Sequence, residues 1–413
     1  MPDPIIRLRN VLALCKAETV EGVDAVPTAL LDAFPFEIDS MSIGSPYTME
    51  ESNEATGTDI AGAPLIIGQP TTFSIKMRLK GAGAGTVYSA AIKPPAHALL
   101  QGCGLKGFFQ AAVAATALAA GTVSSATLVG APYLGVAQLY RGQRLILTGA
   151  PAAGAHPMIA DYTVGRVATL VDLFGAPLSA TNTAEIKPNW TYAPTSPATL
   201  AERTTDQPSN TIYCHTDGLL YKLLGMRGTA KITGDTAKPF YLEITGTCIW
   251  GGQSEVAQPT NAVVANHAAP VFNMQAAISS AFSVNRKLLP ISQFSYDFAR
   301  QVESFEDPNT TIGFGAGQIM GRAGMLECDP LKTSLAIRNH LSELEATSLE
   351  MVGVARAGQT SGNRVALTLP KLVPAKVDMA ARKGAASENL GWRALSAGRD
   401  ASGRDGDAIL CFD

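Results

Sequence analysis

The stretch FPFEIDSMSIGSPYTMEESNEATGTDIAGAPLIIGQPTTFSIKMRL, Phe34 to Leu79, decides how this chain is organised. Its first part reads as an alternating strand, with Phe34, Phe36 and Ile38 on one side and Glu37 and Asp39 on the other. Its last part alternates more cleanly, with apolar residues at every second position: Phe73, Ile75, Met77 and Leu79. Period-two patterns of this kind predict two half-buried antiparallel strands.

A long segment, Gly44 to Pro70, separates these two predicted strands. It is rich in glycine and proline and carries four acidic residues, Glu50, Glu51, Glu54 and Asp59. A loop of this length without regular structure is uncommon inside a compact domain, and where it occurs it is usually functional. We interpret the segment as an arm that extends from the sheet and becomes ordered on contact with another subunit.

The composition is typical of a folded, turn-rich β protein. Charged residues make up 16% of the 413 positions and hydrophobic ones 46%, and the formal net charge is -3. This charge offers no basic surface that would neutralise DNA phosphates. Residues 1–10 lack a signal-peptide pattern, and residues 107–140 hold too many turn formers for a membrane helix. Six cysteines stand singly, which favours reduced, buried thiols: Cys15, Cys103, Cys214, Cys248, Cys328 and Cys411.

The following residues predict the rest of a first domain, interrupted by an insertion. Pro94-Pro95 followed by Leu99-Leu100 and two glycines is typical of a short helix. Short apolar runs between residues 140 and 187, separated by Gly and Pro, predict a small inserted β module. Asp217-Gly218 between two apolar runs predicts a hairpin, and a further strand runs from Phe240 to Trp250.

The carboxy-terminal part repeats this order of elements. Phe294, Tyr296 and Phe298 alternate with polar residues, and an acidic, glycine-rich stretch then predicts a second, shorter arm. Residues 319–327 predict the partner strand. Asp329-Pro330 predicts the start of a helix that runs through Leu341, and four strands follow before residue 413.

The predicted fold is therefore mainly β. It has two tandem antiparallel β-sandwich or barrel domains, each with one short helix and a long arm, and an inserted small β domain. The first domain comprises 1–106 and 209–255, and the inserted module with its connectors comprises 107–208. A linker, 256–270, leads to the second domain, 271–413.

No pattern of a known catalytic site is present. The chain has no G-x-S-x-G, H-E-x-x-H, P-loop or EF-hand spacing, and its five histidines are far apart. The run Gly313-x-Gly315-x-Gly317 precedes a strand, whereas a phosphate-binding loop follows one. The acidic residues of the arm can bind a cation, but a solvated or partner-facing cluster is the more common use of such residues. We expect a protein that is not an enzyme and has no cofactor and no metal.

Several short motifs resemble those of the major tail tube proteins of bacteriophages with long, non-contractile tails. The opening is Leu12-x-Leu14-x-Lys16-Ala17-Glu18-Thr19 with Gly22-x-Asp24-x-x-Pro27-Thr28. The strand 73–79, the helix before Gly102-Cys103-Gly104 and the strand 240–246 are similar to elements of that family. So is the hairpin Asp217-Gly218-x-x-Tyr221-Lys222-Leu223-x-Gly225-x-Arg227-Gly228. The insertion resembles a module that some of these proteins carry, through Tyr140-x-Gly142-x-x-Leu145, Ile159-x-Asp161-Tyr162 and Val167-Ala168-Thr169.

The resemblance implies a structural virion protein without chemistry of its own. Such subunits form β-rich rings that stack into the tail tube, first around the tape-measure protein and below a tail terminator, and DNA later passes through without specific binding. It implies assembly in the host cytoplasm, a place in the virion tail and no membrane. The arm is then expected to join neighbouring rings through Pro46, Tyr47, Met49, Glu50, Glu51, Glu54 and Asp59.

In one respect the chain departs from the family. Family rings have six subunits with one tube domain each, whereas this chain is predicted to carry two, so that three chains form a pseudo-hexameric ring.

Two other functions remain open on the sequence alone. One is a carbohydrate- or receptor-binding β protein of the phage tail or surface, with Trp190, Tyr192 and Tyr162 exposed for stacking on sugars. The other is a hydrolase on a β scaffold, which the absence of catalytic motifs makes the weakest of the three hypotheses.

Overall fold

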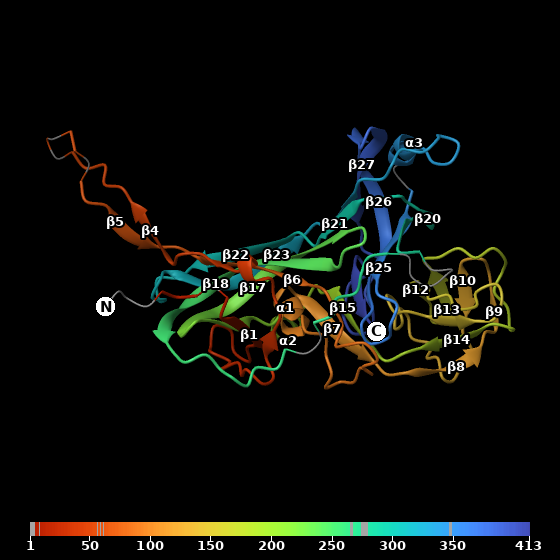
Figure 1. Ribbon diagram of the computed structural model, residues 1–413, viewed down its shortest axis with the longest axis horizontal. Helices are drawn as coiled ribbons and strands as arrows, with labels where there is room; N and C mark the ends of the chain where they lie inside the picture. Colours follow the sequence, from red (N-terminus) through yellow and green to blue (C-terminus); the bar gives the residue numbers. More distant parts are fainter. Residues whose placement is uncertain are drawn as a thin grey trace.

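The computed structural model of the chain describes residues 5–7, 9–55, 57, 59–60, 62–264, 267–273, 280–346 and 349–413. The expected arm, linker and second domain are therefore described except at positions 56, 58, 61, 265, 266, 274–279, 347 and 348, which lie outside the described residues. The predicted β class is confirmed: the described part consists mainly of antiparallel strands with three short α-helices, and none of its sheets closes on itself. The main sheet joins strands from both halves of the chain (Figure 1).

Strands of the first half pair in the order β3–β6–β18–β17–β16–β1–β2. We call these strands repeat 1. Their bounds are β1 Val11–Ala17, β2 Ala33–Phe34, β3 Ser42–Ile43, β6 Thr71–Arg78, β16 Asn210–Thr216, β17 Leu219–Asp235 and β18 Phe240–Glu255. The alternation predicted for β6 is confirmed, since its apolar side chains are buried in the core. Helix α1, His97–Gly102, begins after Pro94-Pro95 as predicted and contacts β1, β16 and β17.

Strands of the second half pair in the order β21–β24–β27–β26–β25–β19–β20. We call these strands repeat 2. Their bounds are β19 Phe282–Val284, β20 Lys287–Leu288, β21 Gln293–Asp297, β24 Met325–Cys328, β25 Met351–Ala357, β26 Val365–Arg382 and β27 Ala385–Ala394. Taken in chain order, every pairing between two strands of repeat 1 has its counterpart between two strands of repeat 2. The two repeats therefore share one topology.

The two repeats also share their register. Ile43 pairs with Phe73, and Tyr296 pairs with Leu326, so that equivalent residues in this region lie 253 positions apart (296 − 43 and 326 − 73). The same register shift occurs where β16 meets β17 and where β25 meets β26. Because the two repeats share both their strand pairing and this register shift, their equivalent positions can be compared residue by residue.

Each repeat sends out a hairpin after its third strand. Arm 1, residues 44–70, contains β4 (Tyr47–Glu50) and β5 (Leu65–Gly68), and arm 2, residues 297–323, contains β22 (Arg300–Glu306) and β23 (Phe314–Arg322). Met49 pairs with Ile66 in arm 1, and the residues 253 positions later pair in arm 2. The expectation of a shorter second arm is therefore wrong, because both arms have the same length, and their registers agree at this pair and the next one, Glu50 with Leu65 and Glu303 with Gln318. The arms are also more regular than expected, since each carries two paired strands.

The inserted module has a core of its own, which runs from Val113 to Ile186 (yellow, Figure 1). It consists of two small sheets, β12-β13-β10-β9 and β11-β14-β8. Their bounds are β8 Val113–Ala117, β9 Ala120–Gly121, β10 Ser125–Thr127, β11 Ile146–Thr148, β12 Ile159–Tyr162, β13 Val167–Leu170 and β14 Thr183–Ile186. The flanking strands β7 (Leu105–Gln110) and β15 (Asn189–Pro194) pair with each other and belong to the main sheet. On its other edge β15 pairs with the last strand, β28 (Ile409–Phe412).

Two predicted elements differ from the structure. The strand expected over Phe34 to Ile38 ends at Phe34, because Pro35 has no amide hydrogen to continue the ladder, and a 3-10 helix, Ile38–Ser40, follows. The helix expected from Asp329 to Leu341 is limited to α3, His340–Glu345. The Asp329 carboxylate instead accepts hydrogen bonds from two backbone amides of the preceding chain, those of residues 292 and 293. The short helix α2, Leu200–Asp206, was not predicted.

Candidate assembly surface

The two repeats meet along a single strand. β18 occupies one edge of β17 throughout, and β16 occupies the opposite edge only as far as Met226. Beyond that point β21 of repeat 2 takes over this edge, pairing residues 293–297 with residues 235–231. Ile232 lies opposite Tyr296 in the ladder, and both side chains are fully buried. Burial raises the pKa of the Tyr296 phenol, which therefore stays neutral within an apolar joint.

Arm 2 enlarges this joint by lying along β17 and β18 of repeat 1 (Figure 1). The buried Arg227 donates from Nη1 to the carbonyl oxygen of Gly317 at 2.8 Å. Arg300 donates from Nη2 to the carbonyl oxygen of Gly104, also at 2.8 Å. Burial, together with the neighbouring Arg322, lowers the pKa of Arg300 to about 10. Arg227 also forms an ion pair with Glu21 at 2.7 Å, whereas Arg300 is held by its hydrogen bond to the Gly104 carbonyl oxygen. These contacts fix the arm in one position.

One close approach in this contact requires glycine. Gly225 has a φ of +61°, and a Cβ atom on it would lie 2.7 Å from the Cβ of Ala316 in arm 2. The backbone of β17 can reach arm 2 only because this side chain is absent.

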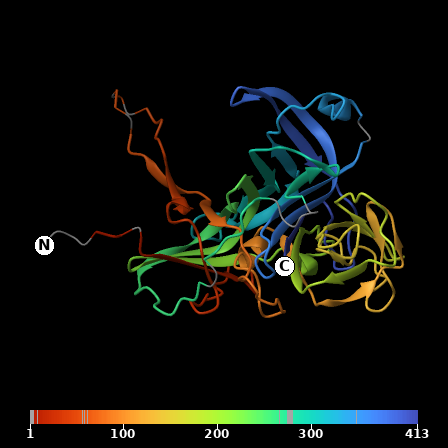
Figure 2. The ribbon, with the colours of Figure 1, turned by 45° about the vertical axis from the view of Figure 1, so that its right-hand side comes forward.

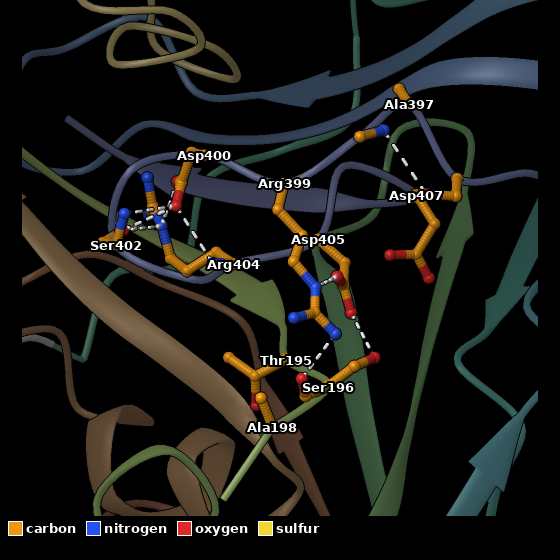
Figure 3. Close-up of polar contacts among 12 residues, drawn as sticks. Thr195, Ser196, Ala198, Ala397, Arg399, Asp400, Ser402, Arg404, Asp405 and Asp407 are labelled. Atoms are coloured by element: carbon orange, nitrogen blue, oxygen red, sulfur yellow. Dashed lines mark hydrogen bonds and ion pairs between the residues drawn. The ribbon is translucent and has the colours of Figure 1, made fainter. Parts of the chain in front are cut away.

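The end of arm 2 is held by an ion-pair cluster. Arg322 contacts Asp405 at 2.6 Å and Asp407 at 2.8 Å. Burial opposes the charge of Arg322, but its hydrogen bonds to the two carboxylates raise its pKa. Figure 3 shows Asp405 also accepting hydrogen bonds from Arg399 and Ser196, at 3.1 Å and 2.6 Å. The cluster thus links arm 2, the chain that follows β15 and the loop that precedes β28.

A second cluster holds the same loop (Figure 3). The Asp400 carboxylate accepts hydrogen bonds from Arg404 at 2.7 Å and from Ser402 at 2.7 Å. Arg404 is buried and donates from Nη1 to the hydroxyl of Thr191 in β15 at 2.7 Å. Because both clusters end on or beside β15, they fasten the carboxy-terminal loop of the chain to this strand of the main sheet.

The inserted module packs firmly on repeat 2. Met158, Ala160 and Val171 of the module form a small buried core with residues of β25, β26 and β28. Two buried ion pairs flank that core, Arg144 with Asp413 at 2.8 Å and Arg356 with Asp172 at 2.7 Å. The module is therefore attached to the host through a buried apolar surface and buried ion pairs. A small sheet with one apolar face gains stability by burying that face against the host.

Arm 1 has the opposite surroundings from arm 2. In both Figure 1 and Figure 2 it projects away from the body of the molecule. Its base approaches arm 2 closely at Gly68, where a Cβ would lie 1.9 Å from the carbonyl oxygen of Ile312. Farther out, its large apolar side chains are exposed: Tyr47, Met49, Leu65, Ile66 and Ile67. Of the residues predicted to make contacts between rings, Pro46 is half-buried at the base, while Tyr47, Met49, Glu50, Glu51, Glu54 and Asp59 are exposed on the arm.

The predicted sugar-binding aromatic residues are not on the surface. Trp190 and Tyr192 are buried in the main core, and the indole of Trp190 donates to two backbone carbonyl oxygens. Tyr162 is buried in the core of the inserted module. The expectation that these three rings are exposed is therefore wrong. The prediction that all six cysteines are buried thiols is confirmed.

Chemical sites are not evident in the described residues. Within the described ranges, no three His, Cys, Asp or Glu side chains are grouped so that they could hold a metal ion. None of the helices found there is long and apolar enough to cross a membrane. Searches with the sequence find no matching protein family and no matching curated protein.

Sequence reasoning found arm 1 but missed the joint between the repeats. A signal for the repeat is present: Gly62-Ala63-x-x-Ile66-x-Gly68 in arm 1 corresponds to Gly315-Ala316-x-x-Ile319-x-Gly321 in arm 2. The spacing of this motif equals the 253-residue offset of the strand pairing. The joint residues Ile232 and Tyr296 carry no such signal, because ordinary core positions look alike in a single sequence.

Proposed function

We propose that this chain is a structural subunit that assembles with copies of itself into stacked rings and forms the tail tube of a phage with a long, non-contractile tail. One observation carries the proposal. Repeat 1 is joined to repeat 2 within the chain through β17 and β21. The equivalent edge of repeat 2, on β26, is left uncovered, and so are the apolar side chains of arm 1. The motifs shared with tail tube proteins support the same function.

The physical argument for self-assembly concerns uncovered surface. An open strand edge presents unpaired amide and carbonyl groups, which favour pairing with another strand. An exposed group of large apolar side chains marks an interaction surface rather than a solvated loop. Tyr47, Met49, Leu65 and Ile66 form such a group on arm 1. Burying them against another subunit offsets the loss of entropy on ordering the arm.

The proposed partners follow from the tube. The main partner is the chain itself, and each ring uses both repeats of three chains. The tape-measure protein occupies the lumen during assembly, a tail terminator closes the tube, and DNA passes later. A chain with a net charge of -3 suits a lumen through which a polyanion slides without being bound. The proposed location is the virion tail, after assembly in the host cytoplasm.

The competing hypothesis of a sugar-binding tail protein has less support. It depends on aromatic platforms, and Trp190, Tyr192 and Tyr162 are all buried. Their packing explains their presence without a ligand.

Electron microscopy of the purified full chain tests the proposal. The expected result is rings, or tubes with a regular axial repeat, that become more abundant as the protein concentration rises. A chain that stays monomeric at every concentration, alone and with a lysate of phage-infected cells, would contradict the proposed function.

A further inference from the structure

We infer that a second copy of this chain pairs with the open edge of β26, through the segment that ends in its β3, and thereby repeats between chains the joint that β17 and β21 make within one chain. The inference rests on the proposed self-assembly and adds the partner surface and its register. The expected partners are residues 378–382 of one chain and residues 44–40 of the next.

Equivalence between the repeats gives this register. Gly246 and Trp392 are equivalent, because they pair with Phe73 and Leu326, which are themselves equivalent. Following β18 and β27 toward their hairpin turns makes Ile244 equivalent to Leu390. The partners of these two residues, Ala230 and Val377, are then equivalent as well.

Two residues farther along, Ile232 corresponds to Met379. In the completed joint, Ile232 lies opposite Tyr296, whose equivalent in repeat 1 is Ile43. Met379 of one chain is therefore expected to lie opposite Ile43 of the next.

The edges required for this pairing are open. β25 follows β26 only as far as Leu372, just as β16 follows β17 only as far as Met226. Among the described strands, none pairs with the edge of β26 beyond Leu372 on that side. β21 has two partners, β24 and β17, whereas its counterpart β3 has only β6. In repeat 1, the outer edge of β3 thus lacks a partner strand. In repeat 2, the edge of β26 beyond Leu372 lacks one.

Burial of the side chains at these positions agrees with a missing neighbour. Ile232 is 0% exposed, whereas Met379 is 81% exposed. Tyr296 is fully buried, whereas Ile43 is only half-buried. The hairpin of β26 and β27 that carries Met379 stands out from the body in Figure 1. The apolar side chain of Met379 is thus exposed at a position whose equivalent in repeat 1, Ile232, is completely buried.

The same joint also places arm 1. Arm 2 follows β21 directly and lies along repeat 1, and arm 1 follows β3 directly. Pairing of β3 with β26 therefore brings the base of arm 1 to repeat 2 of the neighbouring chain. This assigns the base of arm 1 to a contact within a ring, whereas the sequence suggested a contact between rings.

Crosslinking in the full chain tests the register. One preparation carries Ile43→Cys and another carries Met379→Cys, and a short bifunctional maleimide is added to their mixture. The six native cysteines are buried, so wild-type protein provides the background. We expect a shift of the denatured protein to the mass of two linked chains. The matched control replaces Met379→Cys by Asp378→Cys, whose side chain points to the other face of the strand, and loses most of this product.

A second variant tests the surface without a reagent. Met379→Asp is expected to abolish assembly, because a charge replaces an apolar side chain that the joint buries. Leu200→Asp changes a similarly exposed apolar residue on α2, 77% exposed, and is expected to leave assembly intact. Circular dichroism at equal concentration confirms that both variants fold.

The outcomes separate this inference from the proposed function. The inference is overturned, and the proposed function left standing, by one pair of results. Wild-type protein forms rings or tubes without the 43–379 crosslink, and Met379→Asp forms them equally well. A wild-type chain that never assembles would overturn both.

Discussion

The guanidinium of Arg144 donates to the carboxylate of Asp413 at 2.8 Å, and both side chains are only 2% exposed. Arg144 belongs to the inserted module, and Asp413 follows β28 of the main sheet. Arg364 adds a second cation 3.2 Å from the same carboxylate. Burial alone would raise the pKa of Asp413, but the two arginines lower it below its ordinary value. The pair therefore joins two parts of the chain that are far apart in sequence.

Replacing Arg144 is predicted to loosen this attachment. Arg144→Leu leaves a buried carboxylate with one cation instead of two, and we expect a destabilisation of about 3 kcal/mol. Urea unfolding gives the free energy, and hydrogen exchange in β12 shows whether the module has come away from repeat 2. The control is Lys187→Ala, which removes a partly exposed ion pair with Glu185 and should cost less than about 1 kcal/mol. Equal effects of the two variants would show that the Arg144 pair does not secure the module.

A second prediction concerns acid stability and His97. Its Nδ1 lies 2.7 Å from the hydroxyl of Tyr192, and burial together with Lys93 lowers its pKa from 6.5 to about 3. The unfolded chain therefore binds this proton at a higher pH than the folded chain does. The contribution of His97 to stability is complete above pH 6.5 and is lost as the pH falls toward 3.

Measured stability should therefore fall from pH 6.5 to pH 4, and His97 alone contributes a slope of up to about 1.4 kcal/mol per pH unit. His97→Gln keeps a polar partner for Tyr192 but cannot take up the proton, so its slope should be smaller. Urea unfolding of both proteins at several pH values gives the comparison. His156, with a pKa lowered to about 4, titrates in both proteins and cancels in the difference. Identical slopes would show that His97 is not the group responsible.

The sequence predicted elements whose signal is local. The alternation from Phe73 to Leu79 marks a buried strand, and Asp217-Gly218 forms a hairpin turn in which both residues have positive φ. The helix predicted at Asp329 failed for a tertiary reason. The Asp329 carboxylate binds Arg382 and does not cap a helix. Leu335 and Ile337, apolar residues within the predicted helix, are exposed, so no burial of an apolar face stabilises a helix there.

The assembly surface was predictable only in part, for the same reason. Arm 1 is recognisable because its length, glycines and prolines interrupt two strands. The joint of Ile232 with Tyr296 depends on which strand edges meet in space, and residues on either side of it look like any other core positions. Only the register of the two repeats shows that Met379 lacks the neighbour that Ile232 has.

A third prediction tests arm 1 by shortening it. Deleting residues 47–60 removes β4 and the exposed tip but leaves β3 and β6, so the variant should fold and fail to form tubes. Electron microscopy distinguishes how assembly fails. Loss of rings fits an arm that lies on the neighbouring chain, whereas accumulation of single rings fits an arm that joins rings. Long tubes formed by the deletion variant would contradict both roles.

The apolar surface of arm 1 can be tested without a deletion. The double substitution Met49→Ser and Ile66→Ser removes two exposed, directly paired side chains, and we expect the concentration needed for assembly to rise at least tenfold. Each exposed apolar side chain that is buried on binding contributes about 1.5 kcal/mol or more, which is roughly tenfold in an equilibrium constant. Val164→Ser, at a similarly exposed position in the inserted module, is the control. An equal change in both proteins would show that arm 1 makes no specific contact.

The last prediction concerns the symmetry of the ring. If joints within chains and joints between chains alternate, a ring of six repeats contains three chains. Tethering makes every second joint intramolecular, at an effective concentration up to about millimolar, which favours closure with few free chains. The inserted module interrupts repeat 1 only, so its density should appear three times around the ring. Three-fold averaging of electron micrographs should sharpen the module, and six-fold averaging should blur it. Native mass measurement of isolated rings gives the chain count independently. A ring of six complete chains would contradict a wall of six repeats. Twelve repeats would then form the wall, or half of them would lie outside it.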